Sequence, residues 1–169
     1  MKNAILITVV SAITFFAGSA AAVPPVDDPF EYQSNGFYIG DCGDFDVLND
    51  AYIAGYVRYR FDRNGDLAFI RLHLSATESV YYRSDDPSIY LPGGPGEVQN
   101  DLIKFRDDPP SYFVTGIPFK VTVPGHGVIF HEAGRIDFDL DTLEVIWQSG
   151  GPHDFNDQNL DALCDALSD

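Results

Sequence analysis

The chain has 169 residues, a formal net charge of −16 at pH 7 and a sequence pI of about 4.2. This length is enough for one domain with a well-formed hydrophobic core. A surface this acidic repels phosphate backbones and anionic membranes, so the composition argues against nucleic acid as a partner.

The N-terminus has the pattern of a secretory signal peptide. Lys2 precedes an apolar run over residues 4–17, and the small residues that follow satisfy the small-x-small cleavage rule, which places the cut before Val23. A transmembrane anchor is the rival interpretation, but the apolar run is too short for one. The sequence therefore predicts a cleaved signal peptide over 1–22, a secreted (extracellular or periplasmic) location, and no membrane span after cleavage.

Two cysteines give the next structural prediction. Cys42 and Cys164 lie near opposite ends of the mature chain, and in an exported protein an even count favours a disulfide. Two buried free thiols are the alternative. The prolines and acids of residues 23–35 predict an extended, partly mobile leader, and residues 36–169 are then a single β domain.

The first strong strand pattern is a β-hairpin. Residues 52–61 and 67–77 have strand character on either side of 64–65, an Asn-Gly pair that favours a two-residue hairpin loop. This loop places Tyr59 opposite Ile70, which makes one face of the hairpin apolar and the other polar and aromatic. A type I turn with a glycine bulge would shift the register by one residue and mix the two faces, so the first register is favoured.

Short strands joined by turns fill most of the remaining chain. A loop rich in proline and glycine covers residues 85–96, and the turn 124–127 joins the strands of a second hairpin. The predicted strands span residues 102–106, 112–123, 128–132 and 143–148. Gly134 is expected to bend or bulge the third of these, and residues 135–139 continue it. Gly116 and Pro118 predict a bulge or an edge position. The pattern predicts an all-β antiparallel meander, closed or nearly closed into a small barrel that removes its exposed edges; a β-sandwich is the alternative.

A short helix is predicted at the C-terminus. Asn156 is suited to cap its first turn. The apolar stripe that follows at helical spacing consists of Leu160, Leu163, Cys164 and Leu167. The disulfide would therefore hold this helix against the first strand.

Three histidines and one glutamate are the obvious candidates for metal ligands. On a strand, His131 and Glu132 point to opposite faces, so they cannot bind one ion together without a bulge. His126 lies at a turn tip between glycines, and His153 is expected to hydrogen-bond the turn with Asp154. The sequence therefore predicts no metal site and no cofactor, and it carries no nucleophile or phosphate-loop motif.

The polar-aromatic face of the first hairpin is the best candidate for a ligand site. Its residues are Tyr52, Tyr56, Arg58, Arg71 and His73. If this face lines a barrel mouth, the tyrosines stack on a ligand and the arginines bind a carboxylate or phosphate. Two arginines side by side also favour an anion between them. The alternative is that this face meets water and that nearby aspartates neutralise the arginines.

At VTVPGHGVIFHEAGRIDFD, with GGPHDF after it and a cysteine in the late LCDAL, the chain resembles a recurring group of small exported bacterial proteins. Their shared pattern is a strand, a P-G-x-G turn, a strand closed by G-R-[IV]-x-F-D, a G-P-H segment and a cysteine near the C-terminus. The match covers roughly the last third of the chain strongly and the first hairpin more loosely. The resemblance implies export and β architecture, and it supplies no functional residues.

Export, a β meander and the absence of a catalytic motif together predict a non-catalytic binding or interaction module for a small amphipathic or anionic ligand. A small barrel enzyme of the isomerase or cyclase kind is one alternative, and a structural envelope or matrix protein is another. The interior of the β domain distinguishes these alternatives. A binding module or an enzyme needs a hollow with convergent polar groups, and a structural protein needs none. The sequence leaves the oligomeric state open.

Overall fold

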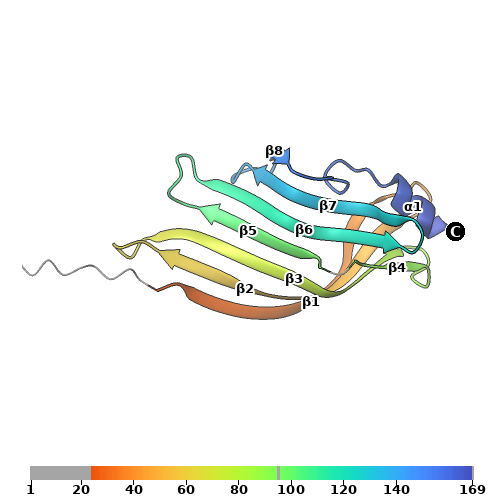
Figure 1. Cartoon of the computed structure of the whole chain (residues 1–169), viewed down its shortest axis with the longest axis horizontal. Helices are drawn as coiled ribbons and strands as arrows, with labels where there is room; N and C mark the ends of the chain where they lie inside the picture. The colour runs from red at the N-terminus through yellow and green to blue at the C-terminus, as the bar shows by residue number, and fades with distance from the viewer. Residues whose placement is uncertain (1–23, 95, 169) are drawn as a thin grey trace, which may run out of the picture.

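Eight strands form one antiparallel sheet in the computed structural model, which describes residues 24–94 and 96–168 (Figure 1). The elements are β1 (Val26–Asp41), β2 (Asp46–Phe61), β3 (Leu67–Arg83), β4 (Tyr90–Pro92), β5 (Val98–Lys104), β6 (Ser111–Val123), β7 (Gly127–Phe138), β8 (Val145–Ser149) and α1 (Asp161–Ser168). The sheet order is β1-β2-β3-β5-β6-β7-β8, and β4 pairs with β3 beside this path. The predicted antiparallel meander with a short C-terminal helix is confirmed.

The predicted signal peptide over 1–22 lies outside the described residues. Within the part of the chain that the structure describes, no helix has the length and apolar character needed to cross a membrane.

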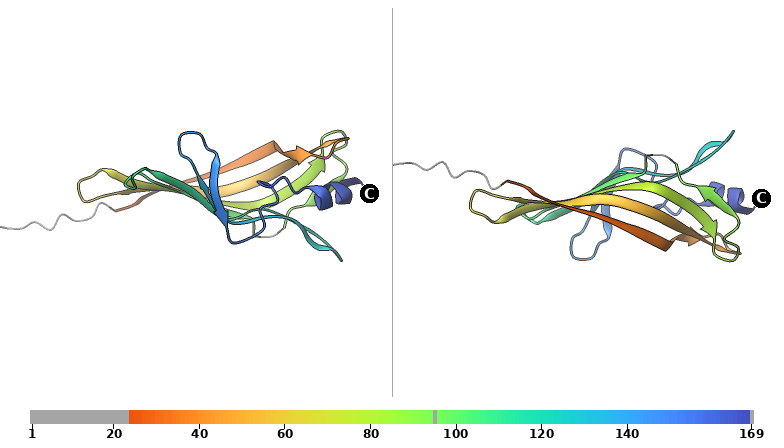
Figure 2. Two further views of the ribbon diagram at one scale, coloured as in Figure 1. Left: turned by 90° about the horizontal axis from the view of Figure 1, so that it is seen from above. Right: turned by 90° about the horizontal axis from the view of Figure 1, so that it is seen from below.

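Closure of the sheet into a barrel is not shown by the strand pairing. β1 and β8 stand at opposite ends of the path, and no ladder joins them within residues 24–94 and 96–168. The barrel and its sandwich alternative therefore both stay predictions. The structure does show a strongly bent sheet: the strands form a single layer at one end and diverge around α1 at the other (Figure 2).

The hydrophobic core lies at the end of the molecule that holds α1. Its fully buried side chains are Ile39, Val47 and Tyr81 from β1 to β3, Val121 and Phe130 from β6 and β7, and Leu163 and Leu167 from α1. Register shifts in the β1–β2 and β2–β3 ladders bend these long strands, which lets their far halves pack against β6 and β7. The predicted disulfide joins Cys42, directly after β1, to Cys164 of α1.

The predicted leader is instead part of the sheet. β1 starts at Val26, which lies opposite Tyr59 of β2. Pro29 is tolerated because β1 is an edge strand, where a missing N–H donor has little cost. The Asp27 carboxylate accepts two hydrogen bonds from the Arg58 guanidinium of β2. Prolines and acids suggested a leader, but they are also the residues that keep an edge strand from pairing with other chains.

The first hairpin has the predicted register along most of its length and a different turn at its tip. Residues 53–60 of β2 pair with β3 in the favoured alignment. At the tip the register shifts by one, so that Phe61 pairs with Leu67 and the turn is wider than two residues. Asp62 accepts backbone hydrogen bonds inside this turn, and Gly65 adopts the positive φ of 90° that a glycine bulge requires. The rejected turn type therefore occurs, but a bulge restores the favoured register beyond it.

A bulge also bends β6, as its glycine and proline predict. The β6–β7 register shifts between Gly116 and Phe119. β7 continues through Gly134, where the sequence predicted a bend or a bulge within one run. Gly116 and Gly134 lie opposite each other, so the irregularity falls at the same level in both strands.

Candidate functional site

A cleft of about 330 Å³ opens on the apolar face of the bent sheet. Ala51 and Ile53 of β2 form part of its wall together with Leu74 and Ala76 of β3. The volume and the mainly apolar lining are typical of a site for a small ligand. The short alanine side chains help to leave this space open.

An aromatic cluster forms the opposite wall of the cleft. Phe37 of β1 stacks on Phe119 of β6 with ring centroids 5.8 Å apart. Phe155 lies in the segment between β8 and α1. Its ring centroid is 6.1 Å from that of Phe37 and 4.8 Å from that of Phe119. Tyr32 and Phe37 are 46% and 44% exposed, so they lie at the mouth of the cleft. Three segments that are distant in the sequence therefore meet in one wall.

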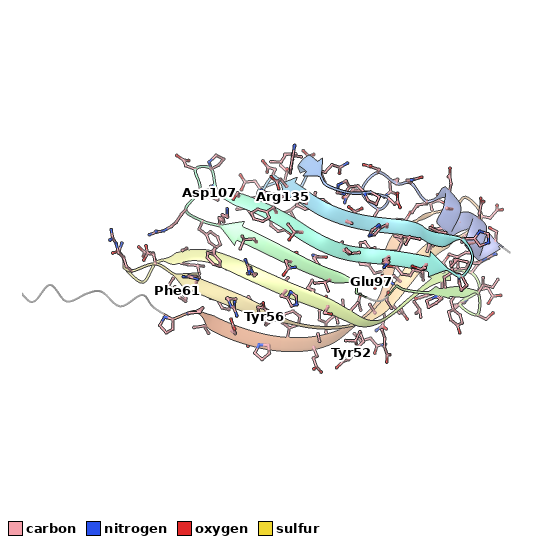
Figure 3. All side chains as sticks on the ribbon, in the orientation of Figure 1. Tyr52, Tyr56, Phe61, Glu97, Asp107 and Arg135 are labelled. Carbon is pink, nitrogen blue, oxygen red and sulfur yellow. A yellow bond between two sulfur atoms is a disulfide. The ribbon has the colours of Figure 1, made fainter. Side chains whose placement is uncertain are left out.

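Glu97 places a carboxyl group in this otherwise apolar lining. It directly precedes β5, as labelled in Figure 3, and belongs to the lining of the cleft. Its side chain is buried, with only 3% of the residue exposed. Its Oε1 accepts a hydrogen bond from the Tyr81 hydroxyl at 2.9 Å and another from the Lys120 N–H at 2.8 Å. Burial raises the pKa of Glu97, and these hydrogen bonds only partly offset that effect. Asn49 also lines the cleft and donates to Ser79 Oγ at 3.0 Å.

The proline- and glycine-rich loop over 85–96 positions Glu97. The middle of this loop is attached to the sheet, because β4 pairs with β3 and Gly93 forms a bridge to Val121 of β6. A Cβ atom on Gly93 would lie 2.6 Å from Ser79 Cβ, so this close passage requires glycine. The loop thereby links β3 to β6 beyond the end of β5 and carries Glu97 into the cleft.

Substitution of Glu97 tests this burial. Because the pKa of the folded state is raised, the wild type keeps its full stability below the unfolded pKa and loses part of it as pH rises through the folded pKa. Glu97→Gln stays neutral and keeps an oxygen acceptor, so its stability relative to the wild type should increase from about pH 4 to about pH 7. Glu97→Ala leaves two donors unpaired and should lower the free energy of unfolding by about 2–4 kcal/mol.

Urea unfolding at the two pH values measures both effects. The exposed Glu78→Gln is the matched control and should show little change. A Glu97→Gln variant whose difference from the wild type does not vary with pH would contradict the raised pKa.

A second buried carboxyl group supports the aromatic wall. Glu132 of β7 is 1% exposed, and its Oε1 lies 2.6 Å from His153 Nδ1. Its Oε2 accepts the N–H groups of Phe155 and Asn156 at 3.0 and 3.1 Å. These contacts hold the ring of Phe155 at the cleft. They also tie Asn156 into a turn, so α1 begins at Asp161 rather than directly after the predicted cap.

The three histidines considered as metal ligands make different contacts. Glu132 faces the core while His131 follows the opposite parity, as strand alternation predicts. His153 pairs with Glu132 and not with its neighbour Asp154, which accepts the His131 N–H at 2.8 Å. His126 is exposed at the β6–β7 turn. Across residues 24–94 and 96–168, no group of three or more His, Cys, Asp or Glu side chains is arranged to hold a metal ion.

The five predicted ligand-binding residues lie on the other face of the sheet. They are Tyr52, Tyr56 and Arg58 of β2 and Arg71 and His73 of β3. Figure 3 labels the two tyrosines. Because side chains alternate along a strand, this face is opposite to the one whose Ile53 and Leu74 line the cleft. The structure therefore keeps the five residues together but separates them from the cleft.

Local partners already engage several of these residues. Arg58 lies opposite Arg71, as predicted, and binds Asp27 with both carboxylate oxygens. His73 stacks on Tyr56 with ring centroids 5.1 Å apart. An aspartate beside one arginine is what the solvent-facing alternative expects. The ligand-binding role of this face stays a prediction.

Comparison with protein-family models, with curated proteins and with solved structures gives no significant match to this chain. The function is therefore argued from the geometry of the cleft. Sequence reasoning missed Glu97 because its partners, Tyr81 and Lys120, are 16 and 23 residues away. The sequence feature that could have indicated Glu97 is the long loop before it, since loops of this length often form binding sites.

Proposed function

We propose that the protein is an exported, non-catalytic binding module that holds a small amphipathic ligand in the cleft. The observation that carries this proposal is a mainly apolar hollow of about 330 Å³ lined in part by the buried Glu97. Apolar walls favour the hydrocarbon part of a ligand, and a single polar group fixes the orientation of its polar end. A structural envelope or matrix protein needs no such hollow, so the cleft counts against that alternative.

The chemistry of Glu97 favours a neutral ligand over an anionic one. A carboxyl group with a raised pKa keeps its proton to higher pH than an ordinary glutamate, and the neutral form both donates and accepts hydrogen bonds. A hydroxyl or carbonyl group of a ligand suits such a partner. An ionised ligand would lie close to this carboxyl group in a chain of net charge −16, which is unfavourable.

Export and barrel-like closure belong to the same proposal. A disulfide between Cys42 and Cys164 suits an oxidising compartment outside the cytoplasm. The same disulfide ties α1 to the end of β1, while α1 packs against β7 near the other side of the bend (Figure 1). The helix can thereby cover part of the gap that strand pairing leaves open.

Filling the cleft is expected to abolish ligand binding. Ala76→Trp adds a large side chain to the wall, so a ligand that stabilises the wild type should no longer raise its melting temperature. The matched control is Ala54→Trp, because Ala54 lies on the opposite face of the same hairpin. Thermal-shift screening with neutral amphipathic alcohols, amphipathic acids and sugars provides the measurement.

The outcomes of this screen separate clearly. Stabilisation of the wild type and of Ala54→Trp by one ligand class, without stabilisation of Ala76→Trp, supports the cleft. If no ligand class stabilises the wild type, the proposed cleft site is wrong. It is also wrong if a ligand stabilises Ala76→Trp as much as the wild type.

A small isomerase or cyclase is the second candidate function, and the same Glu97 favours it. A buried carboxyl group with a raised pKa in a cleft is suited to general acid–base chemistry. Glu97→Gln distinguishes the two functions. If the protein is a binding module, neither the wild type nor Glu97→Gln shows turnover. If it is an enzyme, Glu97→Gln still binds the ligand but its rate is roughly 10²–10⁴-fold lower than that of the wild type.

A further inference from the structure

Half of the positive charge of this acidic chain lies on one face of the sheet. The chain has ten Lys and Arg residues and a net charge of −16. Five of the ten share the face opposite the cleft, and we call them the cationic face: Arg58, Arg60, Arg71, Lys104 and Arg135. They come from β2, β3, β5 and β7, and Figure 3 labels Arg135 on the last of these.

Three cations of this face have no acidic partner among the residues that the structure describes. Arg58 is paired with Asp27 and Arg135 with Asp137. In the described ranges 24–94 and 96–168, no ion pair is formed by the other three, which are Arg60, Arg71 and Lys104. Their absence of partners is notable in a chain with 26 Asp and Glu residues. The face is therefore a local site of unneutralised positive charge.

The unpaired cations lie close together around one aromatic ring. Phe69 of β3 pairs with Arg60 on one side and with Lys104 on the other. Adjacent strands are about 4.8 Å apart, so the backbone positions of these two cations flank that of Phe69 at about this spacing. Arg71 follows two residues after Phe69 on the same face of β3. Three positive side chains therefore start from neighbouring positions of β2, β3 and β5 on this face.

Aromatic rings accompany the cations across the whole face. Arg60 lies 5.9 Å from the centroid of Phe69, and both Lys104 and Arg135 lie over Phe113, at 5.3 and 4.0 Å. Trp147 of β8, which is 50% exposed, lies 5.8 Å from Arg135 and extends the series to the edge of the sheet. Cations and rings therefore alternate from β2 to β8 on an open surface.

We propose that the cationic face binds an acidic carbohydrate chain, that is, a glycan whose sugars carry carboxylate or sulfate groups. Guanidinium and ammonium groups bind such anions by charge-assisted hydrogen bonds, and the C–H faces of sugar rings pack on exposed aromatic rings such as Trp147. An acidic peptide would use the cations but not the rings. This proposal is independent of the cleft.

Removal of two unpaired cations tests the proposal. Arg71→Ser with Lys104→Ser should weaken the binding of oligogalacturonate or of a heparin fragment about tenfold or more at low salt. Arg63→Ser with Arg83→Ser changes the net charge equally away from the centre of the face and should stay within about twofold. Thermal unfolding of each double variant checks that it is folded, and titration calorimetry measures the affinity.

A third variant separates a glycan from other anionic partners. Trp147→Ala removes a ring without changing charge, so it should weaken glycan binding and leave any binding of poly-glutamate unchanged. No glycan binding by the wild type at low salt would overturn the proposal. Equal loss in both double variants would overturn it as well, because bulk charge would then explain the binding. Poly-glutamate bound as tightly as either glycan would assign the face to acidic peptides instead.

Discussion

Replacing Cys42 and Cys164 together by serine is expected to lower the free energy of unfolding by about 2–5 kcal/mol. The disulfide closes a loop with a sequence separation of 122, and the loss of that constraint increases the entropy of the unfolded chain. The effect should be near the upper part of this range because α1 has only eight residues and is too short to be stable alone. Its Leu163 and Leu167 are fully buried, so detachment of the helix would open the core.

Denaturant unfolding of the double variant measures this effect. Its melting temperature should fall by about 10 °C or more. The wild type in the presence of a reductant is the matched control and should lose a similar amount. Equal stability of the oxidised wild type and the double variant would show that α1 stays docked without the covalent link.

Glu132→Ala is expected to lower the free energy of unfolding by about 2–5 kcal/mol, because it leaves several buried groups without a partner. The wild-type carboxyl group contacts His153 Nδ1 and accepts the N–H groups of Phe155 and Asn156. Each buried donor that loses its acceptor costs about 1–3 kcal/mol. The removal of the side chain also leaves a cavity beside the core.

Two further variants interpret this loss. Glu132→Gln keeps an oxygen acceptor for backbone donors and should lose less than Glu132→Ala. The exposed Glu144→Ala is the control for a simple change of charge and should alter stability by less than about 0.5 kcal/mol. Urea unfolding at neutral pH compares the three chains. A Glu132→Ala variant as stable as the control would show that water replaces the lost contacts.

The expected link between Glu132 and the cleft is also measurable. Phe155 contributes one ring to the aromatic wall, and its N–H is bound by Glu132. Glu132→Ala should therefore weaken any ligand that the cleft binds, even though Glu132 itself belongs to the supporting contacts. The stability and the ligand affinity of this variant should fall together.

Local patterns were reliable where local physics decides the structure. Alternation of apolar and polar residues predicted the strands of the first hairpin and the pairing of residues 53–60 of β2, since a shift by one residue would expose the apolar face. Strand parity also placed His131 and Glu132 on opposite faces. The tip of the hairpin was predicted wrongly, because hydrogen bonds to Asp62 favour a wider turn than the Asn-Gly pair alone suggests.

Composition was less reliable than alternation at the two ends of the described chain. The acids and Pro29 of the predicted leader occur in an edge strand, where they are compatible with pairing on one side. The helix starts later than predicted because Asn156 donates its N–H to Glu132, a residue of β7. In both places a partner distant in the sequence decided the local structure.

The sequence by itself determined the antiparallel meander, the pairing of Cys42 with Cys164 and the apolar and polar faces of the first hairpin, because each follows from a short-range period or from residue chemistry. Only the tertiary structure decided which face contains a hollow. The bend of β1 to β3 depends on several register shifts acting together, and the aromatic wall depends on three separate segments. The burial of Glu97 and the gathering of five cations on one face are likewise decided by long-range pairing, which local pattern cannot predict.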